Sequence, residues 1–175
     1  MRCYASIADL PEAPDLAVIA TPPATVPPLI GEVGARGTRA ALVLTAGISE
    51  QSGLRQAMLD AARPTCLRVI GPNSFGIFVP SLGLNASFAH LAPAPGHLAF
   101  LSQSGALASA VLDWSVEREI GFSTVVSLGD MADVDVGDLL DLLAGERQTR
   151  AILLYLETVP DARKFMSAAR AAARG

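Results

Sequence analysis

The sequence predicts an α/β fold in which parallel strands alternate with helices along the chain. Short apolar runs of strand length are followed by longer amphipathic segments, the pattern of parallel strands joined by crossover helices. Glycine and proline stand between these segments, where turns are expected. The chain has 175 residues, of which 51% are hydrophobic, so one large or two small domains can bury real cores.

The first half of the chain repeats this pattern up to a corner rich in glycine and proline. Strands are expected over residues 15–23, 39–49 and 66–80, and helices over 26–37 and 50–64. Glycine closes the first helix and Pro64 stops the second. The third strand is expected to give way at the sequence GPNSFG, beyond which the chain continues as irregular extended structure.

A second α/β unit is predicted to follow a proline-rich stretch. Residues 89–97, AHLAPAPGH, alternate proline or glycine with small residues and can continue neither a helix nor a sheet. We therefore expect a boundary there, with one domain over residues 1–93 and another over 94–175. Strands are expected over residues 97–102, 122–129 and 150–157, and helices over 104–119, 134–146 and 160–175.

Composition excludes several classes of protein. The formal net charge of −4 lacks the basic footprint of a nucleic-acid binder. Cys3 and Cys66 are too few for a disulfide framework or a zinc site, and are expected as free thiols. No apolar stretch is long enough for a signal peptide or a membrane span, so we expect a cytoplasmic protein with no membrane partner.

Both ends of the sequence look like cuts through a larger protein. A doubly wound sheet usually opens on a strand that carries a glycine-rich phosphate turn. This chain instead opens on polar residues, and it stops directly after a helix. We expect a fragment whose exposed sheet edges and apolar helix faces favour a homo-oligomer.

The most informative turn is SQSGA at residues 102–106, between a strand and a helix. The first N–H groups of a helix lack internal partners, and the helix dipole favours an anion. Glycine allows close approach and the serine hydroxyls can add donors. The candidate phosphate-binding residues are Ser102, Gln103, Ser104, Gly105 and Ala106. A plain serine N-cap is an equal alternative, whereas a serine nucleophile is disfavoured because the G-x-S-x-G elbow needs glycine at position 100 or 102.

Three further turns end strands at the edge where open parallel sheets bind ligands. They are ATPP at 20–23, LTAG at 44–47 and GPNSFG at 71–76. Asn73 in the third turn can hydrogen-bond its own turn, and the flanking glycines permit unusual backbone angles. Each of the three is also compatible with an ordinary loop.

Acidic residues supply further candidates. Glu157 ends the apolar strand AILLYLE, so its carboxylate should emerge at the ligand edge and meet a donor such as a histidine; a solvated or capping glutamate is the alternative. The four aspartates within residues 129–138 fail the calcium-loop spacing, so no metal site is expected. We expect instead an acidic helix start at Asp135 and Asp138. His90 and His97 flank the proline-rich stretch and are expected to be spacers.

Six segments, taken in order, resemble the α-type part of the nucleoside-diphosphate-forming (NDP-forming) acyl-CoA synthetases, the relatives of succinyl-CoA synthetase. The segments are VIATPP, LVLTAGIS, RVIGPNSFGI, LAFLSQSGALASAVLDW, GFSTVVSLGDMADVDVGDLLDLL and AILLYLE. They keep the family's order and spacing over nearly the whole chain. The resemblance implies a Rossmann-like CoA-binding domain followed by a flavodoxin-like succinyl-CoA-ligase-type domain, both three-layer parallel-sheet units and both truncated here.

The resemblance also implies an activity. The family couples acyl-CoA, phosphate and ADP or GDP with Mg to free acid, CoA and nucleoside triphosphate, through an acyl phosphate and a phosphorylated histidine. By position, Ser102 to Ala106 receive phosphate and Glu157 holds the active histidine. The residues implied on the CoA side are Thr21, Pro22, Pro23, Leu44, Thr45, Ala46 and Asn73.

Departures from the family pattern limit these expectations. The phosphorylated histidine would follow residue 175, the glycine-rich CoA loop would precede residue 1, and nucleotide is bound by an ATP-grasp-type domain or β-type subunit. The chain alone is therefore expected to be inactive. Ser109 stands where succinyl-CoA synthetases carry a larger aromatic residue, so succinate is not assumed. The alternative function is a non-catalytic CoA-binding module of a fused protein-lysine acetyltransferase; a generic dinucleotide-binding domain is weaker because the chain has no G-x-G-x-x-G.

Overall fold

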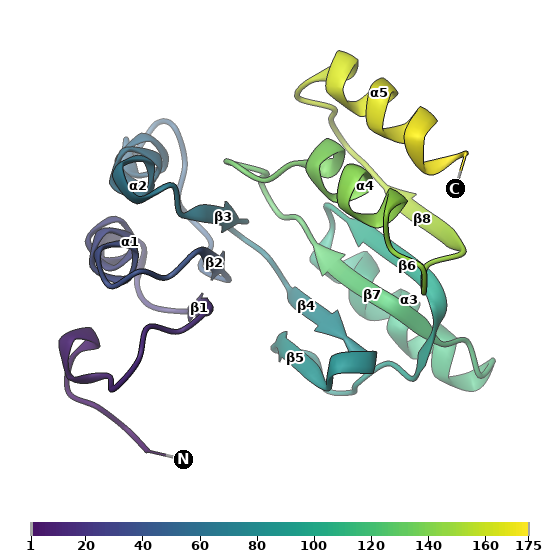
Figure 1. The fold of residues 1–175 in the computed structure, drawn as a ribbon, viewed down its shortest axis with the longest axis horizontal. Helices are drawn as coiled ribbons and strands as arrows, with labels where there is room; N and C mark the ends of the chain where they lie inside the picture. Colours follow the sequence, from purple (N-terminus) through teal and green to yellow (C-terminus); the bar gives the residue numbers. More distant parts are fainter. Residues whose placement is uncertain (1, 175) are drawn as a thin grey trace.

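The computed structural model describes residues 2–174, which form two β-sheets and five α-helices (Figure 1). Every strand and helix predicted above is present, with shorter bounds in most cases. The strands are β1 Leu16–Ile19, β2 Ala40–Val43, β3 Arg68–Ile70, β4 Gly76–Val79, β5 Leu84–Ser87, β6 Pro95–Ser102, β7 Phe122–Ser127 and β8 Ala151–Tyr155. The α-helices are α1 Val26–Ala35, α2 Leu54–Ala62, α3 Gly105–Glu117, α4 Val136–Ala144 and α5 Ala162–Ala172.

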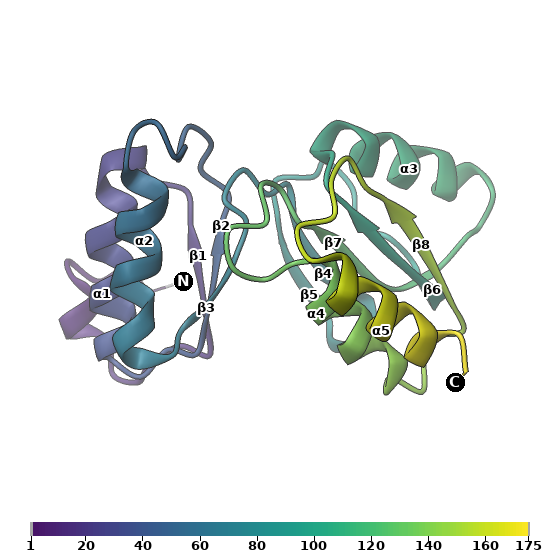
Figure 2. The same cartoon turned by 90° about the horizontal axis from the view of Figure 1, so that it is seen from above.

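The first sheet contains β1, β2 and β3, all parallel and in chain order. Helices α1 and α2 both cover one face of it (Figure 2). Ile30 of α1 and Met58 of α2 are fully buried there with Val43 and Val69. The opposite face carries Leu42, which packs into a core shared with the second sheet. The first unit therefore has a single helical layer in this chain, and its other face is covered by the second unit.

The second sheet has the strand order β5-β4-β7-β6-β8. Strands β6, β7 and β8 are parallel, whereas β4 runs antiparallel to both β5 and β7. Sequence reasoning expected irregular extended chain beyond residue 76, and the structure instead has a hairpin there. Because Ile77 and Phe78 point to opposite faces and both are buried, β4 is a fully packed strand.

The second unit has three layers, with α3 on one face and α4 and α5 on the other (Figure 2). Neighbouring residues of β6 supply both cores. Phe100 packs towards α3 with Phe122 and Leu112, and Leu101 packs towards α4 with Leu140. Such continuous apolar runs are typical of strands covered on both faces. The hairpin lies before the predicted boundary between residues 93 and 94 but pairs with this sheet; the division into two domains at that position stays a prediction.

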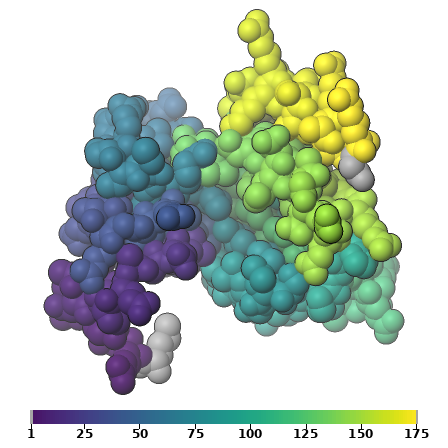
Figure 3. Space-filling model, viewed as in Figure 1, coloured from purple at the N-terminus to yellow at the C-terminus, as the bar shows by residue number. Residues whose placement is uncertain are grey.

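The loop between β7 and α4 connects the two units, which form adjoining lobes in the space-filling view (Figure 3). Val134 N–H donates to the Val69 carbonyl at 3.0 Å, and Val69 N–H donates to Asp133 Oδ2 at 2.7 Å. The loop thus runs beside β3 as an extra hydrogen-bonded segment. The expected acidic helix start is confirmed: Asp135 caps α4 and forms a reciprocal capping box with Asp138.

An ion-pair network, which the sequence did not predict, strengthens this connection. Arg68 of β3 contacts Asp133 at 3.0 Å and Asp138 at 3.4 Å. Lys164 of α5 contacts Asp138 at 2.7 Å and Asp135 at 3.0 Å. The network therefore ties the first sheet to both α4 and α5.

Residues 2–174 contain neither a candidate membrane span nor a candidate metal cluster. None of the helices there is long and apolar enough to cross a membrane. The same residues contain no group of three or more His, Cys, Asp or Glu side chains arranged to hold a metal ion.

Candidate functional site

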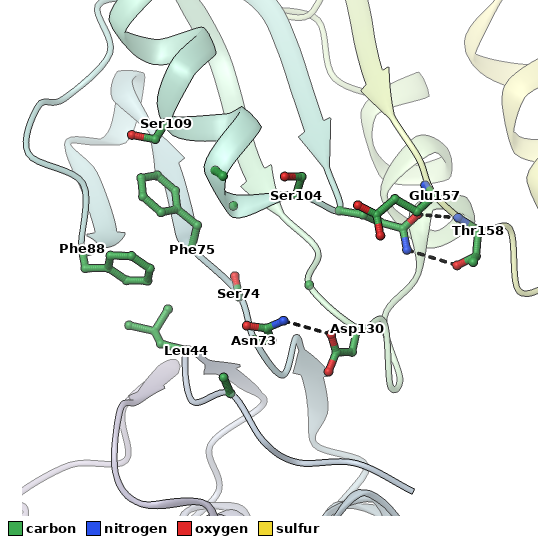
Figure 4. Close-up of a pocket in the computed structure, with 15 residues that line it drawn as sticks. Leu44, Asn73, Ser74, Phe75, Phe88, Ser104, Ser109, Asp130, Glu157 and Thr158 are labelled. Carbon is green, nitrogen blue, oxygen red and sulfur yellow. Dashed lines mark hydrogen bonds between the residues drawn. The ribbon is translucent and has the colours of Figure 1, made fainter.

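Three of the four turns singled out in the sequence, SQSGA, LTAG and GPNSFG, line one cleft of about 830 Å³ between the two units (Figure 4), and the fourth, ATPP, does not. It lies at the carboxyl ends of β2, β6, β7 and β8, as expected for an open parallel sheet. The predicted site residues that line it are Leu44, Ala46, Asn73, Gln103, Ser104, Gly105, Ala106 and Glu157. Ser74, Phe75, Phe88, Ser109, Gly129, Asp130 and Thr158 complete the lining.

The N-terminus of α3 presents unpaired donors to this cleft. Ser104 is the N-cap, and its hydroxyl oxygen accepts the Leu107 N–H at 3.2 Å. Among the described residues, no acceptor is assigned to the N–H groups of Gly105 and Ala106, and the Ser104 hydroxyl hydrogen is also uncommitted. Three donors at a helix N-terminus are the arrangement that favours an anion. The N-cap and anion-site interpretations are therefore compatible.

The side chains of the other two residues of the predicted phosphate turn, Ser102 and Gln103, are engaged in hydrogen bonds within the protein. Ser102 is fully buried; its hydroxyl donates to the Ser104 carbonyl at 2.8 Å and accepts the Ser104 N–H at 3.1 Å. It supports the turn from beneath and does not line the cleft. The side chain of Gln103 is directed towards the loop after β8, where it bonds Glu157 and Thr158.

Within residues 2–174, two carboxylates and no cationic side chain line the cleft. Glu157 and Asp130 are both exposed on its rim, and the lining contains no Lys, Arg or His. None of the ion pairs found in residues 2–174 involves Glu157. Its carboxylate is therefore available to a group that enters the cleft from outside this chain.

The GPNSFG corner fixes the floor of the cleft. Its Asn73 was expected to bond its own turn, but the side-chain amide donates to Asp130 at 3.2 Å, as Figure 4 shows, and the Asn73 N–H donates to the Thr45 carbonyl at 2.9 Å. Gly129 lies directly beneath, at φ 57°, and a Cβ there would collide with the Pro72 carbonyl. Only glycine fits this approach of two backbones.

The residues predicted for the CoA side divide into two groups. Leu44, Ala46 and Asn73 line the cleft, whereas Thr21, Pro22, Pro23 and Thr45 lie beyond its rim. The Thr45 hydroxyl donates to the Thr21 carbonyl at 2.7 Å, so the ends of β1 and β2 form one surface. That surface continues the cleft along the first sheet.

An aromatic wall closes the cleft at the end away from Glu157 (Figure 4). Phe75 and Phe88 pack edge to face with ring centroids 4.8 Å apart, and Ser109 of α3 lies beside them. Sequence reasoning did not identify either phenylalanine as a site residue. Phe88 is 65% exposed, which is unusual for so large an apolar side chain. This exposure, which only a structure reveals, marks Phe88 as a candidate site residue.

The fold and cleft define an α/β protein of two units that share a cleft at the carboxyl ends of their parallel strands, and both units match known domain families. Residues 1–80 match the CoA binding domain family, and residues 95–175 match the succinyl-CoA ligase like flavodoxin domain family. The chain belongs to the NDP-forming acyl-CoA synthetase family, on its α-type side.

Individual relatives place it more closely. The chain is 41% identical over 98% of its length to acetate–CoA ligase [ADP-forming] I of Archaeoglobus fulgidus, and 39% identical over 97% to the α subunit of the corresponding Pyrococcus furiosus enzyme. It spans 26% and 37% of those proteins. A solved acetyl-coenzyme A synthetase 1 of Ca. Korarchaeum cryptofilum, in complex with phosphate and ADP, is 36% identical with a TM-score of 0.93, and the match covers 98% of this chain and 38% of that one.

Proposed function

We propose that this chain is the CoA-binding and phosphate-binding part of an ADP-forming or GDP-forming acyl-CoA synthetase. The observation that carries the proposal is the presence of uncommitted amides, at Gly105 and Ala106, in the same cleft as the unpaired carboxylate of Glu157. One group is suited to an anion and the other to a cationic or hydrogen-bonding partner. A phosphoryl group passing from an acyl phosphate to a histidine needs both.

In this proposal, the α3 N-terminus holds the phosphate. The N–H groups of Gly105 and Ala106 and the hydroxyl of Ser104 donate to phosphate oxygens, and the helix dipole adds to their effect. Glu157 accepts a hydrogen bond from the family's histidine, supplied from outside residues 1–175, which favours the tautomer that attacks phosphorus. The cleft's lack of cations makes these amides its principal source of positive potential.

The residues on the first sheet fit coenzyme A. Leu44 and Ala46 offer an apolar edge beside the anion seat, and the exposed Thr21 after β1 and the half-buried Thr45 after β2 extend it. CoA supplies the thiol that carries the acyl group, and this edge would orient that thiol towards the phosphate. The nucleotide and Mg belong, in this proposal, to an ATP-grasp-type domain or a β-type partner.

The test is phosphate and CoA titration of the chain by calorimetry, with one matched pair of variants. Gly105→Pro removes one amide donor at the first helical position, where proline is tolerated, and the extended backbone of Ser104 suits a following proline. Gly105→Ala adds the same Cβ, which meets Phe75 at 3.1 Å, but keeps the N–H.

We expect phosphate affinity to fall about tenfold in Gly105→Pro, the worth of one charge-assisted hydrogen bond, and to change little in Gly105→Ala. Equal phosphate binding by the two variants would refute the assignment of the amide. If the unaltered chain does not bind phosphate, the site itself is refuted.

A further inference from the structure

Gln103 occupies the junction between the sheet and the helix that begins the anion seat. It follows Ser102, the last residue of β6, and precedes Ser104, the N-cap of α3. Its own N–H donates to the Tyr155 carbonyl at 3.0 Å, which extends the pairing of β6 with β8 by one step. The backbone of Gln103 therefore cannot move without moving the end of β8.

The side chain of Gln103 then reaches across to the loop that carries Glu157. Its Oε1 accepts the Glu157 N–H at 2.6 Å and the Thr158 N–H at 2.9 Å, and its Nε2 donates to Thr158 Oγ1 at 3.1 Å. The two amide donors fix the orientation of the side-chain amide, because reversing it would set donor against donor. Both acceptor sites of Oε1 are used by these two donors.

These bonds are what holds Glu157 in place. Strand β8 ends at Tyr155 and α5 begins at Ala162, so residues 156–161 lie outside both elements. Within residues 2–174, the recorded hydrogen bonds of Glu157 and Thr158 are all made with Gln103. Gln103 therefore holds the main chain of Glu157 and also begins the turn that leads to Gly105.

We propose that Gln103 is a positioning residue that sets the carboxylate of Glu157 relative to the anion seat, and is not itself a phosphate ligand. The inference rests on the proposed function, since it assumes that Glu157 and the α3 amides act on one reacting group. A carboxylate held by a mobile loop loses much of its effect, because misplacement by about 1 Å costs about 100-fold in rate where reacting groups must be aligned.

The test is a double-mutant cycle in the native protein that carries this chain. Gln103→Met keeps the length of the side chain but removes its acceptor and donor, and Glu157→Gln removes the carboxylate. Turnover of acyl-CoA with phosphate and NDP gives kcat and the KM for phosphate. Thermal unfolding and amide hydrogen exchange at Glu157 and Thr158 are measured on the same variants.

We expect Gln103→Met to lower kcat about tenfold or more with the phosphate KM changed less than about threefold, and to have almost no further effect on kcat in the Glu157→Gln background. A raised phosphate KM with unchanged kcat would make Gln103 a ligand and overturn the inference. Fully additive losses would do the same. Unchanged turnover in Glu157→Gln alone would instead overturn the proposed role of Glu157, and with it both claims.

A second pair covers failure of the methionine variant to fold. Gln103→Glu keeps an oxygen at the same distance for both loop amides, whereas Gln103→Asn is one methylene too short to reach them. The glutamate variant should retain slow amide exchange at Glu157 and Thr158 and the higher kcat of the two. Equal exchange and equal kcat in both variants would overturn the inference.

Discussion

Replacing Lys164 by methionine tests the ion-pair network that joins the two units. The Lys164 ammonium contacts Asp138 at 2.7 Å and Asp135 at 3.0 Å, and its stem packs over Gly137, so methionine keeps the packing and removes the charge. The side chain is 36% exposed, between a surface pair and a buried one. We therefore expect a loss of about 1–2 kcal/mol in the free energy of unfolding at pH 7.

The pH dependence of this loss follows from the directions of the pKa shifts. Burial alone would raise the pKa of Asp138, but hydrogen bonds from Lys164 and the Asp135 N–H, with the charges of Lys164 and Arg68, hold it below its ordinary value. Burial would lower the pKa of Lys164, but Asp138 and Asp135 hold it above its ordinary value. Because the pKa of Asp138 is lowered by folding, its carboxylate stabilises the fold above the unfolded pKa of about 3.9. Because the pKa of Lys164 is raised, its ammonium stabilises the fold below the unfolded pKa of about 10.4.

The assay is urea unfolding of both proteins at a series of pH values, with Arg163→Met as the control. Arg163 is exposed, adjacent in sequence and absent from the ion pairs found in residues 2–174, so its loss should cost less than about 0.5 kcal/mol. The difference in free energy of unfolding between the Lys164 variant and the unaltered chain should be largest near pH 7. It should shrink as pH falls below about 4 or rises above about 10.4. A gap no larger than that of the control, or one unchanged at pH 2.5, would refute the reasoning.

Three further outcomes are expected. Ser104→Asp should abolish phosphate binding in calorimetry while leaving thermal stability nearly unchanged, because aspartate caps a helix as well as serine but places a negative charge in the anion seat; intact binding would contradict the site. Gly129→Ala should destabilise the chain by about 2–4 kcal/mol in chemical unfolding, because a Cβ there meets the Pro72 carbonyl. The control Gly83→Ala should cost only about 1 kcal/mol, because Gly83 also has a positive φ but has open space around it. Acyl groups that end in a carboxylate should compete poorly with neutral ones for the cleft, because its lining holds two carboxylates and no cation; equal inhibition by succinyl and propionyl thioesters would contradict this.

Much of the fold could be predicted because it is written in local patterns. The β6 run HLAFLS and the helix after it carry the periods of a buried strand and an amphipathic helix, and both are present. The acidic start of α4 was also predicted, and the structure adds that Asp135 and Asp138 form a capping box there. The hairpin of β4 and β5 was missed because GPNSFG was interpreted as a corner followed by irregular chain. Strand β4 is stabilised by pairing with β7, which lies far along the chain.

The candidate site shows the same division. The α3 N-terminus could be found from five consecutive residues, because the donors and the cap are all local. The use of Gln103 to hold Glu157 could not, because its partners lie 54 and 55 residues away. Nor does any sequence pattern reveal that Ser102 is buried beneath its own turn, or that Phe88 stands exposed against Phe75.

The place of β4 between β5 and β7 in the second sheet determines how this polypeptide can be divided. A cut after residue 93 would separate the β4–β5 hairpin from β7. Each piece would then have a strand edge whose backbone N–H and C=O groups are unpaired and exposed to water. The two pieces should therefore aggregate when they are produced separately. They should form a folded complex when they are mixed, because each carries the strand that the other lacks.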